Sequence, residues 1–218
     1  MMKFSDKTLA VLKNFASINS GVVFRPGKIQ KTMDANKQIL VEATLDDDFP
    51  AEFGIYDLNN FLGNVTSLKN PDLDFTKEHV IMKEGDFTLT YLACSPNLII
   101  TPPNKELVLK SVDVKFDLSN ANFSRLLKVA NMNTLTHISL VGENGSLLLK
   151  VYDPANDTSN HGASRLGDYA GNDFKVTFKT ENLKLLPDDY EVQLQIGTFA
   201  QFVNKDGNLK YFVSQEAK

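Results

Sequence analysis

The side chains that most often perform catalysis or hold metals are few in this chain, and they are badly spaced for either purpose. Its three histidines, His79, His137 and His161, are far apart, and none has a ligand-type residue three or four positions later. Metal-binding helices use that spacing. His137 also falls in an alternating strand pattern, so we expect it to be structural. The histidines therefore predict no metal site.

Two groups of aspartates are the remaining candidates for a cation site. The run Asp46-Asp47-Asp48 could bind a divalent cation, but a solvated turn between two strands is the favoured interpretation. The segment 153–173 contains four further aspartates, without the spacing of a calcium-binding loop. These are Asp153, Asp157, Asp168 and Asp173. We expect no bound metal in either place.

Nucleophilic and phosphate-binding motifs are absent from the sequence. Cys94 is the only cysteine, so neither an intrachain disulfide nor a thiolate metal cage can form. It has no histidine nearby in sequence, and we expect it in the core. The patterns GxxxxGK[ST] and GxSxG do not occur. We therefore expect a protein that is not an enzyme and that carries no cofactor.

The composition is that of a globular chain with a mildly acidic balance. Its 218 residues are 42% hydrophobic, which suffices for one large or two small cores, and the net charge is −4. An acidic chain argues weakly against nucleic-acid binding. The first fourteen residues look amphipathic and not like a signal peptide, and no stretch approaches the roughly 20 apolar residues of a membrane span. We expect a soluble cytoplasmic protein that does not bind membranes.

The order of expected elements repeats once along the chain, which indicates a duplicated unit. Apolar periodicity predicts helices over 5–17, 57–69 and 119–133, and a short helix near 180–186 that ends before Pro187. Strands are expected between them, including one over 107–118, and a polar loop over 153–173. We expect an α+β fold with a first domain at 1–94, an extended proline-containing connector at 95–106 and a second domain at 107–218.

Several co-ordered segments resemble the DNA polymerase sliding clamps, or processivity factors, of tailed bacteriophages. They are VLKNFASINSG at 11–21, IYDLNNFLG at 55–63, PPNK at 102–105 and LGDYAG at 166–171. The resemblance covers essentially the whole chain. It is strongest before residue 70 and looser after 110, and the loop at 153–165 and the last few residues depart most.

The resemblance implies a DNA-clamp fold with two tandem clamp domains, each an antiparallel sheet with two helices, and three chains in a closed ring. The ring would encircle double-stranded DNA without reading its sequence and would tether the replicative DNA polymerase. The resemblance also implies an ATP-dependent clamp loader and a transcription factor as partners. It further implies a virus-encoded protein that works in the host cytoplasm.

The charges of the four expected helical segments support this interpretation independently. Segments 5–17, 57–69, 119–133 and 179–187 hold seven basic and three acidic residues, against sixteen basic and twenty-four acidic elsewhere. Basic helices in an acidic protein suit a ring that meets phosphates from its hole. We expect these residues to face DNA: Lys7, Lys13, Asn14, Lys69, Arg125, Lys128 and Lys184. The plainer alternative is that the lysines are the solvated sides of amphipathic helices.

The outer face of the 57–69 helix is neutral and polar, which would allow DNA to slide past it without being bound tightly.

Partner proteins would use an apolar contact, and the connector residues Leu98, Ile99 and Ile100 are the candidates. Alternatively, these three residues only hold the two domains together.

Two other function classes remain open at this stage: a structural β-rich component of the phage particle, and a non-specific single-strand binder. The second class needs aromatic platforms among basic residues. The chain has no tryptophan, and most of its phenylalanines fall at core-facing positions.

Overall fold

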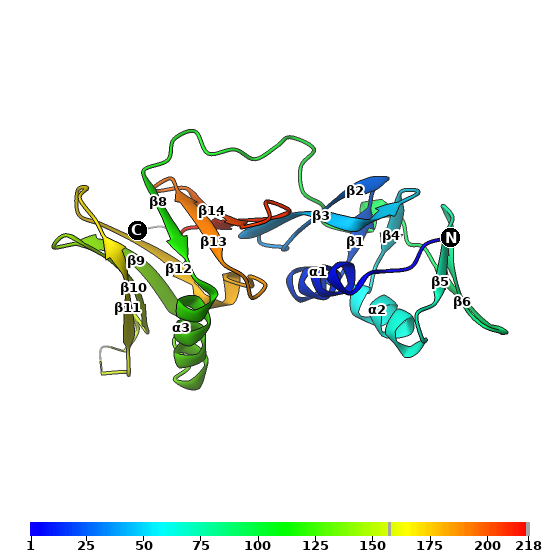
Figure 1. Ribbon diagram of the computed structural model, residues 1–218, viewed down its shortest axis with the longest axis horizontal. Coiled ribbons are helices and arrows are strands. Elements are labelled where there is room, and N and C mark those ends of the chain that lie inside the picture. Colours follow the sequence, from blue (N-terminus) through cyan, green and yellow to red (C-terminus); the bar gives the residue numbers. More distant parts are fainter. Residues whose placement is uncertain (157, 217–218) are drawn as a thin grey trace. The chain divides into compact units, whose positions relative to one another are not determined.

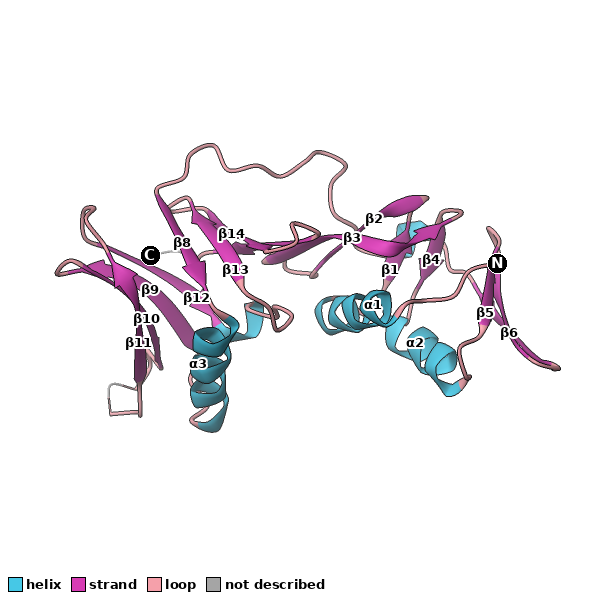
Figure 2. Cartoon of the chain, in the orientation of Figure 1, coloured by secondary structure: helices cyan, strands magenta, loops and turns pink. Residues whose placement is uncertain are grey.

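The computed structural model describes residues 1–156 and 158–216, which form two compact units, 1–106 and 107–218. Each unit combines antiparallel strands with helix (Figures 1 and 2). Within the described residues, no helix is long and apolar enough to cross a membrane.

Unit 1 begins with a helix and continues as short antiparallel strands. Strand β1 pairs with β4, β2 pairs with β3, and β5, β6 and β7 form a three-stranded sheet in that order. Its elements are α1 (Asp6–Ile18), β1 (Val22–Phe24), β2 (Gly27–Met33), β3 (Ile39–Phe49), β4 (Phe53–Ile55), α2 (Leu58–Ser67), β5 (Asp72–Phe75), β6 (His79–Glu84) and β7 (Phe87–Leu92).

Both helices of unit 1 begin at side chains that accept hydrogen bonds from free backbone amides. Ser5 Oγ accepts from the Thr8 amide at 3.1 Å, and Asp57 Oδ1 accepts from the Asn60 amide at 2.9 Å. Such caps satisfy donors that the first turn of a helix leaves unpaired. The predicted helices over 5–17 and 57–69 are therefore confirmed to within two residues at each end.

The core of unit 1 is built largely from phenylalanine rings. Phe24 stacks on Phe49 with centroids 4.3 Å apart, and Phe75 meets Phe49 edge-on at 5.5 Å and Phe53 at 5.6 Å. Phe61 brings the apolar face of α2 into this cluster. Offset and edge-on aromatic pairs are favourable beyond the area they bury, so this cluster fixes α2 against the strands.

Unit 2 contains two four-stranded antiparallel sheets and one α-helix among its described residues. The strand orders are β8-β13-β14-β15 and β11-β10-β9-β12. The elements are β8 (Val114–Leu118), α3 (Asn120–Met132), β9 (His137–Glu143), β10 (Ser146–Tyr152), β11 (Gly162–Asp168), β12 (Phe174–Lys179), η2 (Thr180–Asn182), β13 (Tyr190–Leu194), β14 (Phe199–Asn204) and β15 (Leu209–Ser214).

The turn between β9 and β10 shows why this hairpin forms where the sequence predicts it. Asn144 and Gly145 have φ values of 50° and 75°. These positive values match the two-residue turn that suits the twist of paired strands, and asparagine and glycine adopt them most easily. Ser146 then pairs with Glu143, and the register continues to Tyr152 against His137.

The main departures from expectation lie in unit 2. The expected helix near 180–186 is only the single 3₁₀ turn η2, whose preceding residue Lys179 provides no side-chain cap. The expected strand over 107–118 is confined to β8. The expected loop over 153–173 contains the strand β11, whose polar residues suit an edge position and hide the alternation that normally marks a strand.

A further correction concerns the aspartate run at 46–48, which lies inside β3 and not in a turn. Asp47 Oδ2 accepts a hydrogen bond from the Ser5 amide at 2.8 Å, just before α1. In unit 2, Asp189 Oδ1 accepts from the Asn120 amide, also at 2.8 Å, at the start of α3. Each unit therefore fixes the start of a helix with an acid from a distant segment, which is consistent with a duplicated plan.

Candidate nucleic-acid interface

The helix α3 presents two cations to solvent on the side opposite its buried residues. Phe123, Leu126 and Ala130 are buried, whereas Arg125 and Lys128 are exposed. The buried face packs on β10 and β11, where the side chains of Leu126 and Val129 occupy the space left by Gly162. Because the cations share no contact with that core, they are available to an external ligand.

The helix α1 repeats this arrangement in unit 1. Leu12, Phe15 and Ala16 are buried, and Lys7 and Lys13 are exposed. The third predicted residue, Asn14, is half-buried and accepts a hydrogen bond at its carbonyl from Ser17 Oγ at 2.7 Å.

The helix α2 lies beside α1 but carries no charged residue at all. Its outward residues include Asn60, Gly63 and Ser67, which are exposed, and Asn64 donates from Nδ2 to the Asn60 carbonyl at 2.9 Å. Lys69 lies two residues beyond the helix, and its backbone amide donates to Glu84 Oε2 at 3.0 Å. Unit 1 therefore joins a basic helix to a neutral polar one.

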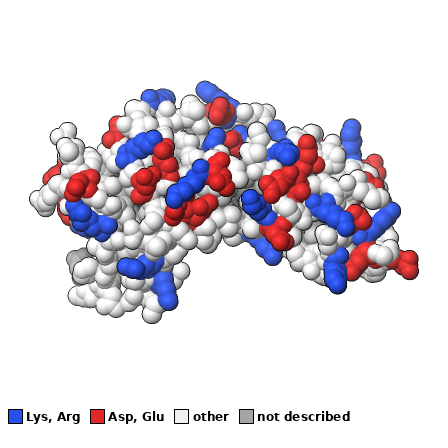
Figure 3. Space-filling view, viewed as in Figure 1, with Lys and Arg blue, Asp and Glu red and all other residues white. Residues whose placement is uncertain are grey.

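The cations on the helices differ from those on the sheets in their ion pairing. Seven ion pairs occur among the described residues, and each lies on or next to a strand. None of them includes Lys7, Lys13, Lys69, Arg125 or Lys128. The cations that they do include are Lys3, Lys31, Lys115, Lys150, Arg165, Lys179 and Lys205. Figure 3 shows blue and red groups interspersed over the strands, whereas the blue groups over α3 have no red neighbour.

The seventh predicted residue, Lys184, does not lie on a helix. It follows the turn η2 and is exposed, and Leu183 beside it is buried in the core of unit 2. The structure thus brings Lys7, Lys13 and Lys69 into unit 1, and Arg125, Lys128 and Lys184 into unit 2.

The connector candidates divide into one buried residue and two exposed ones. Ile99 is 9% exposed, and its Cγ1 atom lies 3.3 Å from the position a Cβ would take at Gly21. Leu98 is 66% exposed and Ile100 is 46% exposed. The connector is also held to unit 1 by polar contacts: Asn19 Nδ2 donates to the Ile100 carbonyl at 3.0 Å, and Arg25 Nη1 donates to Asn104 Oδ1 at 2.9 Å.

The candidate metal ligands do not converge. Among the described residues, which leave out Asp157, no group of three histidine, cysteine or acidic side chains is placed to hold a metal ion. Cys94 is half-buried, and this burial raises the pKa of its thiol, which disfavours the reactive thiolate. Its role in the structure is backbone pairing with Gly54, where a side chain would come within 2.5 Å of the Cys94 carbonyl.

Sequence reasoning missed two features of this molecule. One is the set of unpaired sheet edges described below, because which strands lie at an edge depends on pairing between distant segments. The other is a concave sheet surface that contains Ser139, Tyr152 and Lys175. The sequence did contain a signal for this surface. Side chains alternate between the two faces of a sheet along β9, β10 and β12, and this alternation places the three residues on one face.

Comparison with known proteins connects this geometry to one family. Residues 3–90 match the model of the DNA polymerase processivity factor family. The sliding clamp of Vibrio phage KVP40 is 32% identical over 223 residues, covering 99% of this chain and 100% of that protein. The sliding clamp of Escherichia phage RB69 is 30% identical, covering 88% of this chain and 87% of that protein.

Solved structures support the same fold at low sequence identity. The PCNA of A. fulgidus, bound to the C-terminal region of FEN-1, has a TM-score of 0.71 at 12% identity and covers 96% of this chain and 95% of that one. The PCNA of Entamoeba histolytica has a TM-score of 0.70 at 16% identity, covering 99% and 98%. Because relatives of at least 30% identity cover 88–99% of its length, the chain belongs to the sliding clamp family of DNA polymerase processivity factors.

Proposed function

We propose that this chain encircles duplex DNA as a closed ring and tethers the replicative DNA polymerase for processive synthesis. The observation that carries the proposal is the set of unpaired cations on α1 and α3, in a member of the sliding clamp family. A structural component of the phage particle would have sheets but no need for such helices, and family membership favours the clamp.

The proposed ring contains three chains, because two clamp domains per chain complete the six-domain ring that the family resemblance implies. Here residues 1–94 and 107–218 are the domains, with 95–106 between them.

The sheet edges support closure into a ring. The edge of β5 is covered by Met2, whose amide donates to the Leu73 carbonyl at 2.8 Å, and Thr177 on the edge of β12 accepts from the Glu216 amide at 2.8 Å. Among the described residues, the outer edges of β7 and β11 have no strand partner, and the outer edges of β2 and β8 also have none. Exposed edges favour pairing with another chain. A contact between β7 of one copy and β11 of the next would be head-to-tail, which is the kind that builds rings.

Each proposed contact with DNA is weak and does not depend on the base sequence. Lysine and arginine reach phosphates, which position a protein without specifying bases. A closed ring does not need high affinity to stay bound, so the neutral face of α2 is useful: it can pass along the backbone without holding it. Residence comes from topology, and movement comes from weak contacts.

Partner binding is proposed to use the exposed part of the connector. The apolar side chains of Leu98 and Ile100 are exposed to solvent. Ile99 is buried, which favours the alternative that this residue only holds the domains together. Changing Leu98 and Ile100 to serine should weaken polymerase binding with little effect on the melting temperature. Ile99→Ala should lower the melting temperature instead. If the Leu98 and Ile100 changes left polymerase affinity untouched, the contact would have to lie elsewhere.

The chain is proposed to perform no chemical step and to hold no cofactor. Opening and loading of the ring would use ATP on a separate clamp loader, and a transcription factor would use the same platform as the polymerase. These events would take place in the host cytoplasm.

Retention on circular and linear DNA tests the proposed function directly. Rings loaded on circular duplex should remain through gel filtration at high salt and should be lost when the circle is cut once. Equal loss from both DNAs would rule out encirclement. Light scattering supplies the second measurement: a trimer has three times the 24.3 kDa chain mass, and a strict monomer at tens of micromolar would contradict the ring.

A further inference from the structure

Unit 2 has a short irregular segment where the repeated order of elements gives unit 1 the helix α2. After the single turn η2, residues 183–189 form neither helix nor strand. The backbone groups of α2 bond within their own helix, whereas those of an irregular segment need other partners. The partners in unit 2 determine how firmly the chain is held at Lys184, which the sequence predicts to face DNA.

Two tyrosines provide the partners of Leu186. Tyr190 on β13 donates from its hydroxyl to the Leu186 carbonyl at 2.6 Å, and the Leu186 amide donates to the Tyr211 hydroxyl on β15 at 3.1 Å. Both tyrosines are fully buried, and their rings meet edge-on with centroids 6.0 Å apart. Burial raises the pKa of both hydroxyls, so they stay neutral at physiological pH. Side chains of the sheet therefore satisfy both backbone groups of Leu186.

Further contacts hold the segment on either side of Lys184. Leu183 is buried and belongs to the same apolar core as Phe123 of α3. Asp189 Oδ1 accepts a hydrogen bond from the Asn120 amide at the start of α3. Lys184 is exposed between these contacts. Its backbone therefore occupies a fixed position beside α3, although no helix carries it.

We propose that Tyr190 and Tyr211 are positioning residues for DNA binding: their hydroxyls hold residues 183–187 in place of a helix, so that Lys184 meets phosphates beside α3. This inference rests on the proposed function and extends it to two buried residues that do not touch DNA. A charge whose backbone is ordered before binding loses less conformational entropy when a phosphate arrives. Lys184 therefore makes a stronger contact than a lysine on a loose loop would make.

Hydrogen-exchange mass spectrometry of the full chain tests the positioning step without DNA. Tyr190→Phe with Tyr211→Phe keeps both rings and removes both hydroxyls. Amides of residues 183–186 should then exchange up to about tenfold faster, because opening of the segment no longer breaks these hydrogen bonds. Amides of α3 are the reference for a global loss of stability. Unchanged exchange in 183–186 would overturn the positioning role.

Loading onto nicked circular DNA tests whether the ordered segment serves DNA binding. The double phenylalanine variant should load at least about twofold less at low salt, and Lys184→Ala should lower loading by a similar factor. Combining all three changes should add little, because the two defects act through one phosphate contact. Normal loading by the phenylalanine variant, or full additivity of the two defects, would overturn the proposal.

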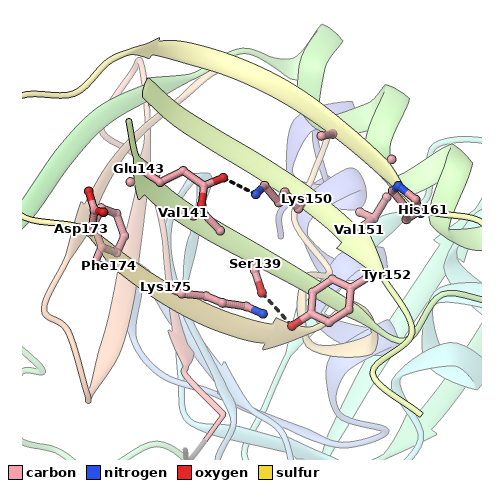
Figure 4. Close-up of a pocket in the computed structure, with 13 residues that line it drawn as sticks. Ser139, Val141, Glu143, Lys150, Val151, Tyr152, His161, Asp173, Phe174 and Lys175 are labelled. Atoms are coloured by element: carbon pink, nitrogen blue, oxygen red, sulfur yellow. Dashed lines mark hydrogen bonds and ion pairs between the residues drawn. The ribbon is translucent and has the colours of Figure 1, made fainter. Parts of the chain in front are cut away.

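Tyr152→Phe is the matched control. It removes a tyrosine hydroxyl that lies 3.0 Å from Ser139 Oγ, on the face of the β11-β10-β9-β12 sheet that points away from α3 (Figure 4). This variant should load like the unaltered protein even where it melts at a lower temperature. A loading defect as large as that of the double variant would overturn the proposal, because stability alone would then explain both. Failure of encirclement is a separate result, seen as equal loss of the unaltered protein from circular and cut DNA.

Discussion

The cations on the helices and the cations on the sheets contrast in their surroundings. On the sheets, Lys115 lies 2.8 Å from Glu191 and Lys205 lies 2.7 Å from Asp189. On α3, Arg125 and Lys128 are equally exposed to solvent but enter no ion pair among the described residues, and the helix contains no acid. Many of the sheet cations therefore carry neutralised charge, although Lys28, Lys83 and Lys175 enter no ion pair among the described residues, whereas both cations of α3 carry free charge.

This difference teaches that net charge is a poor guide to what an acidic protein can bind. Interactions between exposed charges are largely screened beyond about 8 Å at physiological salt. A phosphate that approaches α3 therefore meets Arg125 and Lys128 and little of the distant acidic excess. A phosphate that approaches Lys115 or Lys205 meets a lysine whose charge a nearby carboxylate already balances. Local pairing decides which surface attracts DNA.

Removing the free charge should have the largest effect. Arg125→Ala with Lys128→Ala should reduce loading onto circular DNA at least about tenfold at low salt, because each lost phosphate contact removes counterion release. Loading should also depend less steeply on salt, so the defect should shrink as salt rises. The amount of protein captured on nicked circles over a salt series measures both effects, and base preference should not change.

The matched control removes two charges that are already paired. Lys115→Ala with Lys205→Ala deletes the same number of cations per chain from the sheets. It should leave loading and its salt dependence close to those of the unaltered protein. A defect as large as that of the helix variant would mean that total charge matters and local pairing does not.

Substitutions on the two faces of α3 should affect different properties. Those on the buried face should affect stability, and those on the exposed face should affect DNA binding. Leu126 is 3% exposed, so Leu126→Ala should lower the free energy of unfolding by about 2–5 kcal/mol. Its neighbour Arg125 is exposed, and Arg125→Ala should change that free energy by less than about 0.5 kcal/mol. Urea denaturation measures both. A large stability loss in the Arg125 variant would reveal a structural role for that side chain.

Adding charge to the neutral helix should sharpen the contrast from the other direction. Asn60 is exposed on α2, and Asn60→Lys would give this helix its first phosphate-binding group. We expect diffusion along DNA to slow a few-fold and to become more salt-dependent. Single-molecule tracking on stretched DNA measures the diffusion coefficient, and Asn60→Gln is the uncharged control. Unchanged sliding in the lysine variant would place α2 away from DNA.

The sequence allowed the helices and their exposed cations to be predicted, because both follow from local pattern. Ser5, Asp57 and Ser119 mark the starts of helices, and apolar spacing then fixes which residues remain outside. The ion pairs could not be predicted, since Lys205 and Asp189 come together only when two strands pair. The strand β11 was hidden for a related reason: its residues are polar because one edge is unpaired. The aspartates at 46–48 resembled a turn by composition, but long-range pairing keeps them in β3.

The smallest expected effect concerns a charge that joins the two kinds of region. Asp189 accepts hydrogen bonds from Lys205 Nζ at 2.7 Å and from the Asn120 amide at 2.8 Å at the start of α3, and these contacts lower the pKa of its carboxyl. A lowered pKa in the folded state means that the ionised form stabilises the fold. That contribution is complete above the unfolded pKa of about 3.9 and is lost as the pH falls through the lower folded value. Asp189→Asn should therefore melt slightly below the unaltered protein at pH 7, with the difference closing as the pH falls below about 4. Because asparagine still offers an oxygen to the Asn120 amide, the variant isolates the charge from the hydrogen bond.

Melting curves over this pH range, with both proteins in the same buffers, measure the difference. A gap that stayed constant to the acid end would show that the carboxylate charge contributes nothing to the start of α3.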